Sequence, residues 1–541
     1  MQINPVNLGK QNPLIDDYRQ QKTEIMRHFD YNPFLDSTYS KRLASLSERS
    51  FDRKSLTEAL ITLNKKWGAP ESAYVNIQRL EQDNSAVVIG GQQAGLLTGP
   101  LYTVNKIISI VQFAKQQEKR LGRPIVPVFW IAGEDHDFDE INHIYIPEQT
   151  EMRKHTIQQR VEEKRSLSDI QIDKADAEKW LYQLFGELGE TNFTANLYET
   201  VQDCLQKSHT YVDFFARLIH RLFANEGLVL VDSGAPEFRK LESMHFETLI
   251  NRQPEISKGV YQSLQKLKTR NYPVSLELEK DDGHLFIHHN QERILLTRNE
   301  NGEWSGKQNE LVLSEQELLD IARKTPALLS NNVVTRPVMQ ELLFPTLAFV
   351  GGPGEISYWA ALKPAFNAVG IEMPPVLPRL SFTLMEKRVE KALNKYSLSA
   401  EDVIRNGAGE LKTNWLRTQQ DPPVQQLASE IKNTIAQVHA PLRSVAGEVR
   451  HDLGELADRN LFYLQRDIDF MEKRIVKAIE EKYTKELGEF NLAEMALHPN
   501  GGLQERTWNP ISFINKYGPE FIGQLAHETC SFEHKHFIVY M

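Results

Sequence analysis

The stretch that decides the fold class is residues 85–117, SAVVIGGQQAGLLTGPLYTVNKIISIVQFAKQQ. A short apolar run leads into a glycine-rich turn, and a long amphipathic helix begins after Pro100. An apolar run without alternation is typical of a strand that is buried on both faces of a parallel sheet. The stretch therefore predicts a strand, a turn and a helix of an α/β fold.

Four further β-type runs repeat this unit. They begin near residues 124, 227, 346 and 373, and helical segments separate them. Strands that alternate with helices predict a parallel sheet with helices on both faces. Two stretches interrupt the alternation, at about 145–226 and 255–325, and we interpret both as insertions into one α/β core.

A later part of the chain has heptad spacing. Apolar residues recur three and four positions apart over 431–449 and again over 461–478, with acids and bases between them. This spacing predicts a coiled coil, antiparallel or dimeric, and a long helix packed in a larger domain is the alternative. We expect the heptads to be broken at Pro441, Gly447 and Gly454.

The coiled coil divides the chain into three parts. We expect a core at 1–380, an α-helical coiled-coil domain at 381–490 and a tail at 491–541. The tail is expected to return to the core, because it has mixed texture and ends in a β-type run, HKHFIVYM.

The charge balance argues against several classes of protein. The 541 residues contain 63 Lys and Arg and 73 Asp and Glu, so the net charge is −10. A chain that binds nucleic acid is expected to be basic instead. The longest apolar runs are far shorter than the ~20 residues that span a membrane. With two cysteines and no export signal, we expect a cytoplasmic protein without nucleic-acid or membrane partners.

The first candidate binding element is the turn after the first β-type run. It leads into a helix, and free backbone N–H groups at a helix start bind anions. A plain strand-to-helix turn is the alternative. We expect the turn to hold phosphate or acyl oxygens and Gln93 to stabilise developing negative charge. The residues assigned to it are Gly91, Gln92, Gln93, Gly95, Thr98 and Gly99.

The second β-type run ends in an acidic cluster at 133–139, in which four carboxylates flank His136. Like charges at such density are costly unless they are solvated or paired. We predict that His136 is the general base of a reaction. Asp135 and Asp137 are expected to favour its protonated form or to bind a substrate ammonium group. A magnesium site and a solvated loop with helix-capping acids are the alternatives.

A second glycine turn follows the fourth β-type run. The carboxyl ends of parallel strands meet at one edge of a sheet, so both turns and the acidic cluster are expected to converge on one crevice. We expect phosphate or carboxylate binding there, with plain turn geometry as the alternative. The residues assigned to this turn and to its upstream guanidinium are Arg336, Gly351, Gly352, Gly354 and Glu355.

A third candidate is an accessory nucleotide pocket. Residues 381–386 are expected to begin a helix after the fifth β-type run and to expose N–H donors. An arginine and a tryptophan of the tail would add a charge and a stacking surface. The alternative is that the tail only clamps the core. The residues assigned to the pocket are Thr383, Leu384, Met385, Glu386, Arg506 and Trp508.

No residue is assigned to a metal ion. The tail contains His527, Cys530, His534 and His536, but this run alternates like a terminal strand. Cys204 lies in an amphipathic helix, and we expect it to be buried packing.

Four motifs of this chain resemble the signatures of one family. The segments GGQQAGLLTGPLYTVNK, FWIAGEDHDFDEINH, RPVMQELLFPTLAFVGGPGEISYW and GGLQERTWNPISFINKYG are similar to those of the BshC family, the cysteine-adding enzymes of bacillithiol synthesis. The resemblance runs over essentially the whole chain. It implies a Rossmann-like core related to nucleotidyltransferases, with connecting-peptide insertions and a C-terminal coiled coil that forms a homodimer.

The resemblance also implies an activity. This is the addition of cysteine to glucosaminyl-malate, an amide-forming ligation and the final step of bacillithiol biosynthesis. Because a carboxylate does not condense with an amine in water without activation, we expect ATP or another nucleotide, with Mg²⁺ as a candidate cofactor. A non-catalytic nucleotide-binding scaffold and a metal-dependent amide hydrolase are the alternatives.

Overall fold

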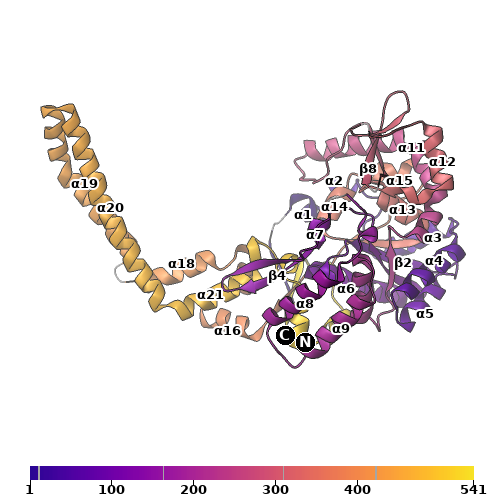
Figure 1. The fold of residues 1–541 in the computed structure, drawn as a ribbon, viewed down its shortest axis with the longest axis horizontal. Coiled ribbons are helices and arrows are strands. Elements are labelled where there is room, and N and C mark those ends of the chain that lie inside the picture. The colour runs from indigo at the N-terminus through magenta and orange to yellow at the C-terminus, as the bar shows by residue number, and fades with distance from the viewer. Residues whose placement is uncertain (10–11, 162–163, 291, 309, 421–422) are drawn as a thin grey trace. The chain divides into compact units, whose positions relative to one another are not determined.

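The computed structural model describes residues 1–541 except 10–11, 162–163, 291, 309 and 421–422 (Figure 1). The chain forms two compact units. The first unit comprises Met1–Ile146, Arg153–Leu384 and Gln504–Met541, and the second comprises Pro147–Met152 and Met385–Leu503. The second unit therefore interrupts the sequence of the first.

A five-stranded parallel sheet forms the centre of the first unit. The five predicted β-type runs all lie in it, which confirms the α/β class. The strand order is β13-β12-β2-β3-β6, so the chain winds from β2 toward one edge and later from β12 toward the other. The direction of winding reverses between β2 and β12. The strands are β2 (Ala86–Gln92), β3 (Ile125–Ile131), β6 (Val229–Asp232), β12 (Thr346–Gly351) and β13 (Val376–Pro378).

Helix α6 (Leu101–Leu121) connects β2 to β3 and packs on β2, β3 and β12. Its apolar residues are buried over most of its length, as expected for a helix that covers a sheet. The helix ends at Gly122, whose φ of 63° lies in the left-handed region that glycine adopts without strain. Helices α4 (Arg53–Lys66) and α5 (Glu71–Arg79) pack beside β6.

Two groups of elements interrupt the parallel sheet. The first consists of the hairpin β4 (His143–Glu148) and β5 (Glu151–Thr156), followed by α8 (Lys174–Leu188), α9 (Thr194–Gln206) and α10 (Tyr211–Leu222).

The second group is a five-stranded sheet of order β10-β9-β8-β7-β11 with two helices. The strands are β7 (Asp282–His289), β8 (Glu292–Arg298), β9 (Trp304–Gly306), β10 (Val312–Leu313) and β11 (Leu329–Asn331). The helices are the 34-residue α11 (Pro236–Thr269) and α12 (Glu315–Lys324).

A third, three-stranded sheet joins both chain termini in the order β1-β15-β14. Strands β1 (Gln2–Val6) and β15 (His536–Tyr540) are antiparallel, and β14 (Phe382–Met385) completes the sheet. The terminal β-type run is thus a strand, as predicted. The helix predicted to begin at 381–386 is wrong, because these residues are mostly strand and α16 (Lys387–Lys395) begins only afterwards.

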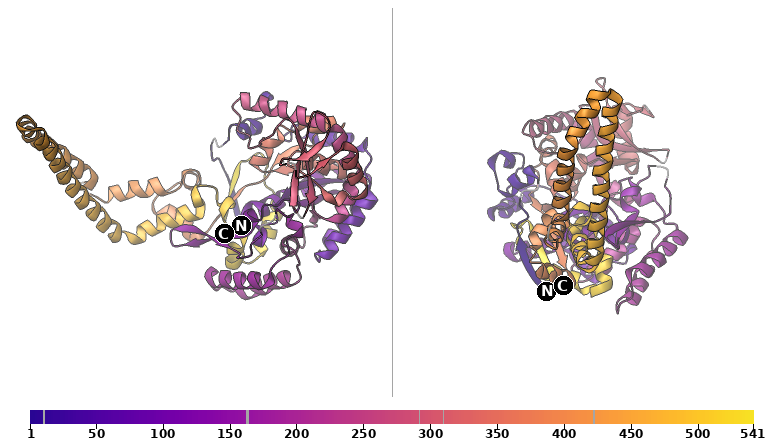
Figure 2. Two further views of the ribbon diagram at one scale, coloured as in Figure 1. Left: turned by 45° about the horizontal axis from the view of Figure 1, so that its top comes forward. Right: turned by 90° about the vertical axis from the view of Figure 1, so that its left-hand side faces the viewer.

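The second unit is helical. The rings of Tyr396, Trp415 and Phe490 pack in tilted and edge-on arrangements with centroids 4.5–5.6 Å apart and hold its short helices together. Two long helices extend from this cluster and lie side by side in both views of Figure 2. The helices of the unit are α16, α17 (Ala400–Asn406), α18 (Gly409–Thr418), α19 (Val424–Val449), α20 (His451–Lys482) and α21 (Thr484–Leu497).

Helices α19 and α20 form an antiparallel hairpin within one chain. The chain reverses at Arg450, which lies between the two heptad stretches. The breaks predicted at Pro441, Gly447 and Gly454 are wrong, because all three lie inside continuous helices. A Cβ atom on Gly454 would lie 3.1 Å from the Cα atom of Gly447, so these glycines allow close contact between the helices.

Candidate functional site

A cavity of about 380 Å³ opens at the carboxyl ends of β2 and β12. Ligands of open parallel sheets bind where the winding reverses, and that is its position here. Its walls come from the loops after β2, β3, β12 and β13 and from α22 (Gln504–Thr507). The polar side chains of the walls include Gln93, Lys106, Asp135, Glu140, Arg336, Glu355, Arg379 and Arg506.

Lys106 of α6 joins the two glycine turns. Its Nζ donates to the carbonyl oxygen of Gly91 (2.6 Å), to Oε1 of Gln92 (3.1 Å) and to Oε2 of Glu355 (2.5 Å). The same Oε2 accepts the backbone N–H of Gly352 (2.8 Å). Three acceptors occupy all three hydrogens of the ammonium group, so Lys106 fixes the turns in place. Burial lowers the pKa of Lys106, and Glu355 opposes that shift.

The glycines of the two turns differ in how closely other atoms approach them. A Cβ atom on Gly91 would lie 2.6 Å from the carbonyl oxygen of Trp130, so the neighbouring strand excludes a side chain there. A Cβ atom on Gly354 would have no atom within 4 Å, and Gly354 lines the cavity. Gly352 also lines it, whereas Gly351 is a buried residue of β12 outside the lining. The second turn therefore has open space beside its backbone.

The second half of the first turn lies away from the cavity. None of Gly95, Thr98 and Gly99 lines it. Instead, Nδ2 of Asn509 donates to three carbonyl oxygens of residues 96–99, at 3.2, 3.1 and 2.8 Å. Asn509 of the tail thus holds this half of the turn, and a ligand-binding role of Gly95, Thr98 and Gly99 stays a prediction.

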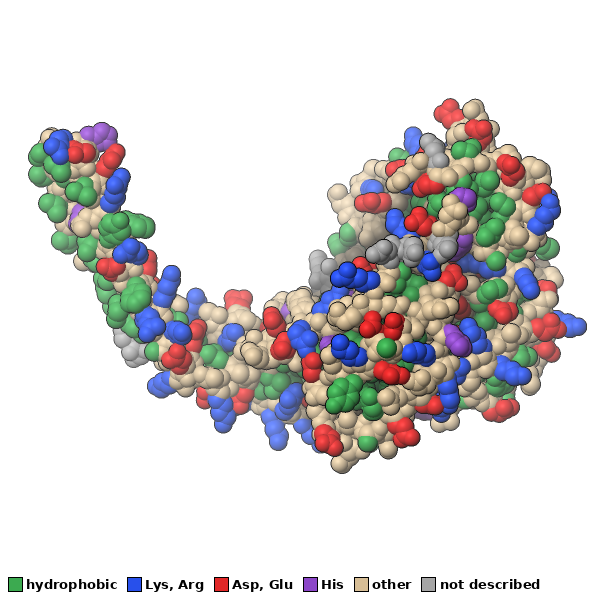
Figure 3. All heavy atoms as spheres, in the orientation of Figure 1, with side chains coloured by type: hydrophobic (Ala, Val, Ile, Leu, Met, Phe, Trp, Pro, Cys, Tyr) green, Lys and Arg blue, Asp and Glu red, His purple; other side chains and the backbone are tan. Residues whose placement is uncertain are grey.

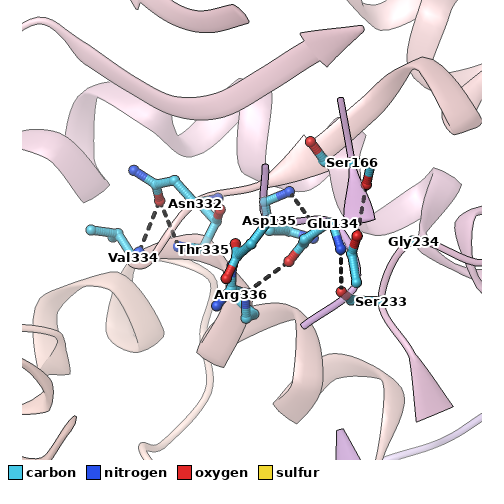
Figure 4. Close-up of polar contacts among 12 residues, drawn as sticks. Glu134, Asp135, Ser166, Ser233, Gly234, Asn332, Val334, Thr335 and Arg336 are labelled. Atoms are coloured by element: carbon cyan, nitrogen blue, oxygen red, sulfur yellow. Dashed lines mark hydrogen bonds and ion pairs between the residues drawn. The ribbon is translucent and has the colours of Figure 1, made fainter. Parts of the chain in front are cut away.

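Glu134 is a fully buried residue after β3 to which no sequence pattern assigned a role (Figure 4). Its Oε1 accepts from Nε of Arg336 (2.8 Å), and its Oε2 accepts from Nη2 of Arg239 (2.7 Å). Oε2 also accepts the backbone N–H of Asn331 (3.2 Å). Burial alone would raise the pKa of Glu134, but Arg239, Arg336 and Arg293 lower it to about 2.

Asp135 lies beside Glu134 and is bound to the same guanidinium group. Arg336 donates through Nη2 to Oδ1 of Asp135 (Figure 4). Burial acts against the charge of Arg336, but Asp135 and Glu134 raise its pKa. Arg336 thus orients Asp135 at the cavity wall, and its guanidinium is already engaged by two carboxylates.

His136 does not line the cavity. Its Nδ1 lies 3.3 Å from Nη1 of Arg293, and its ring packs edge-on against Phe286. Burial and then Arg293 lower the pKa of His136, against the opposing effect of Asp135 and Asp137. The two aspartates do favour the protonated imidazole, as predicted, but desolvation and the neighbouring arginine outweigh them, so the pKa of His136 is lowered overall.

Two other carboxylates of the acidic loop differ in position. Asp137 is exposed and outside the cavity lining. Glu140, on the short helix α7 (Phe138–Ile141), lines the cavity. Among the described residues Glu140 has no hydrogen-bond or ion-pair partner, so its carboxylate is available to a cationic ligand.

Two arginines form a basic wall. Arg379 donates through Nη1 and Nη2 to the two carboxylate oxygens of Glu505, at 2.7 and 2.6 Å. The neighbouring Arg506 is exposed, lines the cavity and has no carboxylate partner in the part of the chain that the structure describes. An unpaired guanidinium is suited to bind a carboxylate or phosphate group.

The accessory nucleotide pocket is not formed as predicted. Leu384 lies in the buried strand β14, and its backbone N–H and carbonyl groups are bound by the side chain of Gln504 at 2.8 and 2.9 Å. Glu386 is buried, and Trp508 is 2% exposed. A buried strand offers no free N–H donors and a buried indole offers no stacking surface, and of this set only Arg506 lines the cavity.

Among the described residues, no three His, Cys, Asp or Glu side chains lie close enough together to hold a metal ion. His536 is buried in β15 and contacts Ser381 Oγ (2.8 Å) and Thr383 Oγ1 (2.7 Å). Cys204 and Cys530 are buried free thiols. The expectation of Mg²⁺ with a nucleotide stays a prediction.

Several polar cavity residues were assigned no role from the sequence, among them Tyr102, Lys106, Glu140 and Arg379. Only Lys106 carried a usable signal. It lies on the apolar face of α6, and a lysine in such a position is almost never buried unless it is paired.

Two family models cover the chain. Residues 1–380 match the N-terminal Rossmann-like domain of bacillithiol biosynthesis BshC, and residues 382–541 match its C-terminal coiled-coil domain. The chain belongs to the BshC family. The five parallel strands of this BshC-family chain lie within the first matched region, and the hairpin of α19 and α20 lies within the second.

Curated relatives match the chain over its full length. The protein named "Putative cysteine ligase BshC" from Oceanobacillus iheyensis is 40% identical over 545 residues, and all of both chains is covered. Proteins of the same name from Bacillus cereus strain B4264 and from Bacillus thuringiensis strain Al Hakam are 40% and 39% identical over 539 residues, again over all of both chains. This member of the BshC family is accordingly an enzyme of the ligase class. No described helix is both long and apolar enough to cross a membrane.

Proposed function

We propose that the cavity joins the carboxyl group of cysteine to the amine of glucosaminyl-malate, and that this amide bond completes bacillithiol. One observation carries the proposal: the 380 Å³ cavity has carboxylates on one wall and arginines on another. Asp135 and Glu140 suit an amine or ammonium group, and Arg506 beside Arg379 suits the carboxylates of malate or the phosphates of a nucleotide. The names of the curated relatives support ligation of cysteine.

The chemistry needs a proton acceptor and an activated acyl group. Glu140 takes the proton that the attacking amine loses, because it lines the cavity and its carboxylate has no other partner among the described residues. Gln93 donates to the acyl oxygen, where a positioned donor stabilises developing negative charge. When bound, ATP with Mg²⁺ would activate the carboxyl group, either as an acyl-adenylate with release of pyrophosphate or as an acyl-phosphate with release of ADP, and AMP or phosphate would then leave as the amide forms.

The coiled-coil hairpin is the dimer interface in this proposal. Large apolar side chains remain exposed on it: Val438 is 75% exposed, Val449 69% and Phe462 62% (Figure 3). Acidic and basic side chains are interleaved on the hairpin, as in the ion pairs Lys432–Asp469 (2.6 Å) and Arg443–Asp458 (3.2 Å). Because charges of both signs are mixed, this surface does not repel a second copy of the chain electrostatically. An exposed apolar stripe of this kind marks an interaction surface, and a second copy of the chain is the partner that we propose.

We also propose a cytoplasmic location. The support is the state of Cys204 and Cys530, which are both buried free thiols. Free thiols without disulfides are typical of a reducing compartment.

The test combines substrate dependence with one pair of variants. Incubation with cysteine, glucosaminyl-malate, ATP and Mg²⁺ is expected to give bacillithiol, and nucleotide turnover is expected to require both other substrates. Release of AMP and pyrophosphate identifies the adenylate, and release of ADP and phosphate identifies the acyl-phosphate. Glu140→Gln is expected to lower turnover about 100-fold, the usual effect of losing a general base.

Asp137→Asn is the matched control, because Asp137 lies in the same loop but outside the cavity. It is expected to keep turnover near wild type. Nucleotide turnover that is independent of cysteine, or a Glu140→Gln enzyme as fast as wild type, contradicts the respective part of the proposal. Sedimentation of the native protein as a monomer contradicts the dimer.

A further inference from the structure

A second cavity, of about 460 Å³, lies outside the catalytic cavity and shares no lining residue with it. It is lined by residues that follow α2 (Thr23–Met26), by one face of α11 and by α15 (Lys363–Ala368). Figure 1 labels these three helices. Helices α11 and α15 approach closely, because a Cβ atom on Gly259 would lie 2.6 Å from Cβ of Pro364. Its volume falls within the range of small-molecule sites.

The charged side chains of this cavity are all basic: Arg27, Lys266, Arg270 and Lys363. The carboxylates paired with them are Glu24, which lies 2.9 Å from Arg270 and 3.7 Å from Arg27, and Asp30, which lies 2.8 Å from Lys363.

Four cations and two carboxylates leave two positive charges in one concave surface. The whole chain has a net charge of −10, so this surplus opposes its overall balance. Like charges gathered in a concave surface repel one another and raise the local concentration of anions.

Neutral hydrogen-bonding groups accompany the cations. Gln262, Ser263 and Asn367 line the cavity, and so does the half-buried His28. Nδ1 of His28 lies 3.0 Å from the carbonyl oxygen of Ala360, so it carries a hydrogen and leaves Nε2 for another partner. Planar guanidinium forks, ammonium groups and an imidazole are the groups that bind phosphate and carboxylate oxygens.

We propose that this cavity is a second binding site of the protein, selective for a small anion with two negative charges, either a phosphate ester or a dicarboxylate. The proposal is independent of the catalytic function, since it rests on other residues. The anion neutralises the two surplus charges, and both arginines contribute forked donors to its oxygens.

His28 provides a local readout of binding. Burial lowers its pKa, the contact with Ala360 opposes that shift, and the charges of Arg270, Lys266 and Lys363 lower it further. Glu24 and Asp30 partly offset these cations. A bound dianion cancels the surplus positive charge, so it is expected to raise the pKa of His28.

The experiment is a titration of the full-length protein with inorganic phosphate at constant ionic strength. Imidazole resonances are followed by NMR over a pH series, and His28→Gln identifies the resonance of His28. Phosphate is expected to raise the pKa of His28 in a saturable manner. Lys266→Glu is expected to weaken phosphate binding about tenfold, which corresponds to ~1.4 kcal/mol.

Lys268→Glu is the matched control, because it makes the same charge change two positions along α11 on an exposed side chain outside the cavity. It is expected to bind phosphate like wild type. A His28 resonance that does not respond to phosphate or to succinate overturns the proposal, as does equal weakening by Lys266→Glu and Lys268→Glu. A response to only one of the two anions assigns the ligand class.

Arg506→Ala separates this site from the catalytic cavity. Its His28 response is expected to equal that of wild type, since Arg506 lines only the other cavity. If Arg506→Ala loses turnover but keeps the His28 response, the anion site is independent of the catalytic cavity.

Discussion

The two glycine turns are similar in sequence but are used differently. In the first turn, Gly91 and Gln92 face Lys106, while residues 95–99 are held by Asn509 and lie away from the cavity. Leu97 and Thr98 adopt positive φ values of 48° and 77°, which residues other than glycine rarely adopt. The second turn, after β12, keeps open space beside Gly354. A glycine-rich turn therefore does not reveal from its sequence whether other protein atoms or open space lie beside its backbone.

The sharpest way to break the link between the turns is Lys106→Met. This change leaves Glu355 without its cation and the carbonyl of Gly91 without a donor, and we expect a loss of about 3 kcal/mol in the free energy of unfolding. Because the turns position the cavity, turnover is expected to fall about 100-fold. Urea unfolding and single-turnover kinetics measure the two effects.

Lys119→Met is the control for this change, since Lys119 is an exposed residue of the same helix. It is expected to shift stability by no more than ~0.5 kcal/mol. Equal stability of Lys106→Met and wild type contradicts the bridging role of Lys106.

The contrast between the turns is tested directly by Gly91→Ala and Gly354→Ala. The first change forces a Cβ atom against the backbone of Trp130 and is expected to cost about 2 kcal/mol. The second lies within α14 (Pro353–Trp359), where alanine is favoured over glycine by ~0.5 kcal/mol, so stability is expected to rise slightly. Gly354→Ala is nevertheless expected to raise KM, because it fills part of the cavity. Thermal unfolding that ranks the two variants the other way round contradicts this distinction.

Asn509→Ala tests the clamp on the first turn. Three buried carbonyl groups lose their donor, and we expect a loss of about 1–2 kcal/mol in the free energy of unfolding. Asn196→Ala, at an exposed position of α9, is the control and is expected to stay within ~0.5 kcal/mol of wild type. If Asn509→Ala destabilises the protein no more than the control does, Asn509 does not stabilise the first turn.

The smallest effect is expected for His136→Asn. Because His136 lies outside the cavity, turnover is expected to stay near wild type at neutral pH. The pKa of His136 is lower in the folded protein than its ordinary value, so the unfolded chain binds the proton first and stability falls as pH drops below ~6.5. His136→Asn removes this contribution and is expected to make stability less dependent on pH there. If His136→Asn lowers turnover as much as Glu140→Gln does, His136 acts as the general base.

Part of the site was readable from the sequence, because strand ends meet at one edge. The turns at Gly91 and Gly352, the acidic loop at Asp135 and the guanidinium of Arg336 were all expected near one crevice, and all four line one cavity. Which carboxylate faces that cavity was not readable. Glu134, Asp135 and His136 are consecutive, yet the first is buried among arginines, the second lines the wall and the third contacts Arg293.

The sequence by itself determined the local elements. Apolar runs defined the five parallel strands, and heptad spacing defined α19 and α20, because burial on two faces and burial along a helical seam each leave a periodic pattern. The tertiary structure alone decided that Phe382–Met385 is a strand and that Asn509 fills the first turn. It also decided that burial, together with Arg293, outweighs the aspartates at His136. Such outcomes depend on contacts between residues hundreds of positions apart, and packing, desolvation and charge at those contacts outweigh the local propensities that a sequence displays.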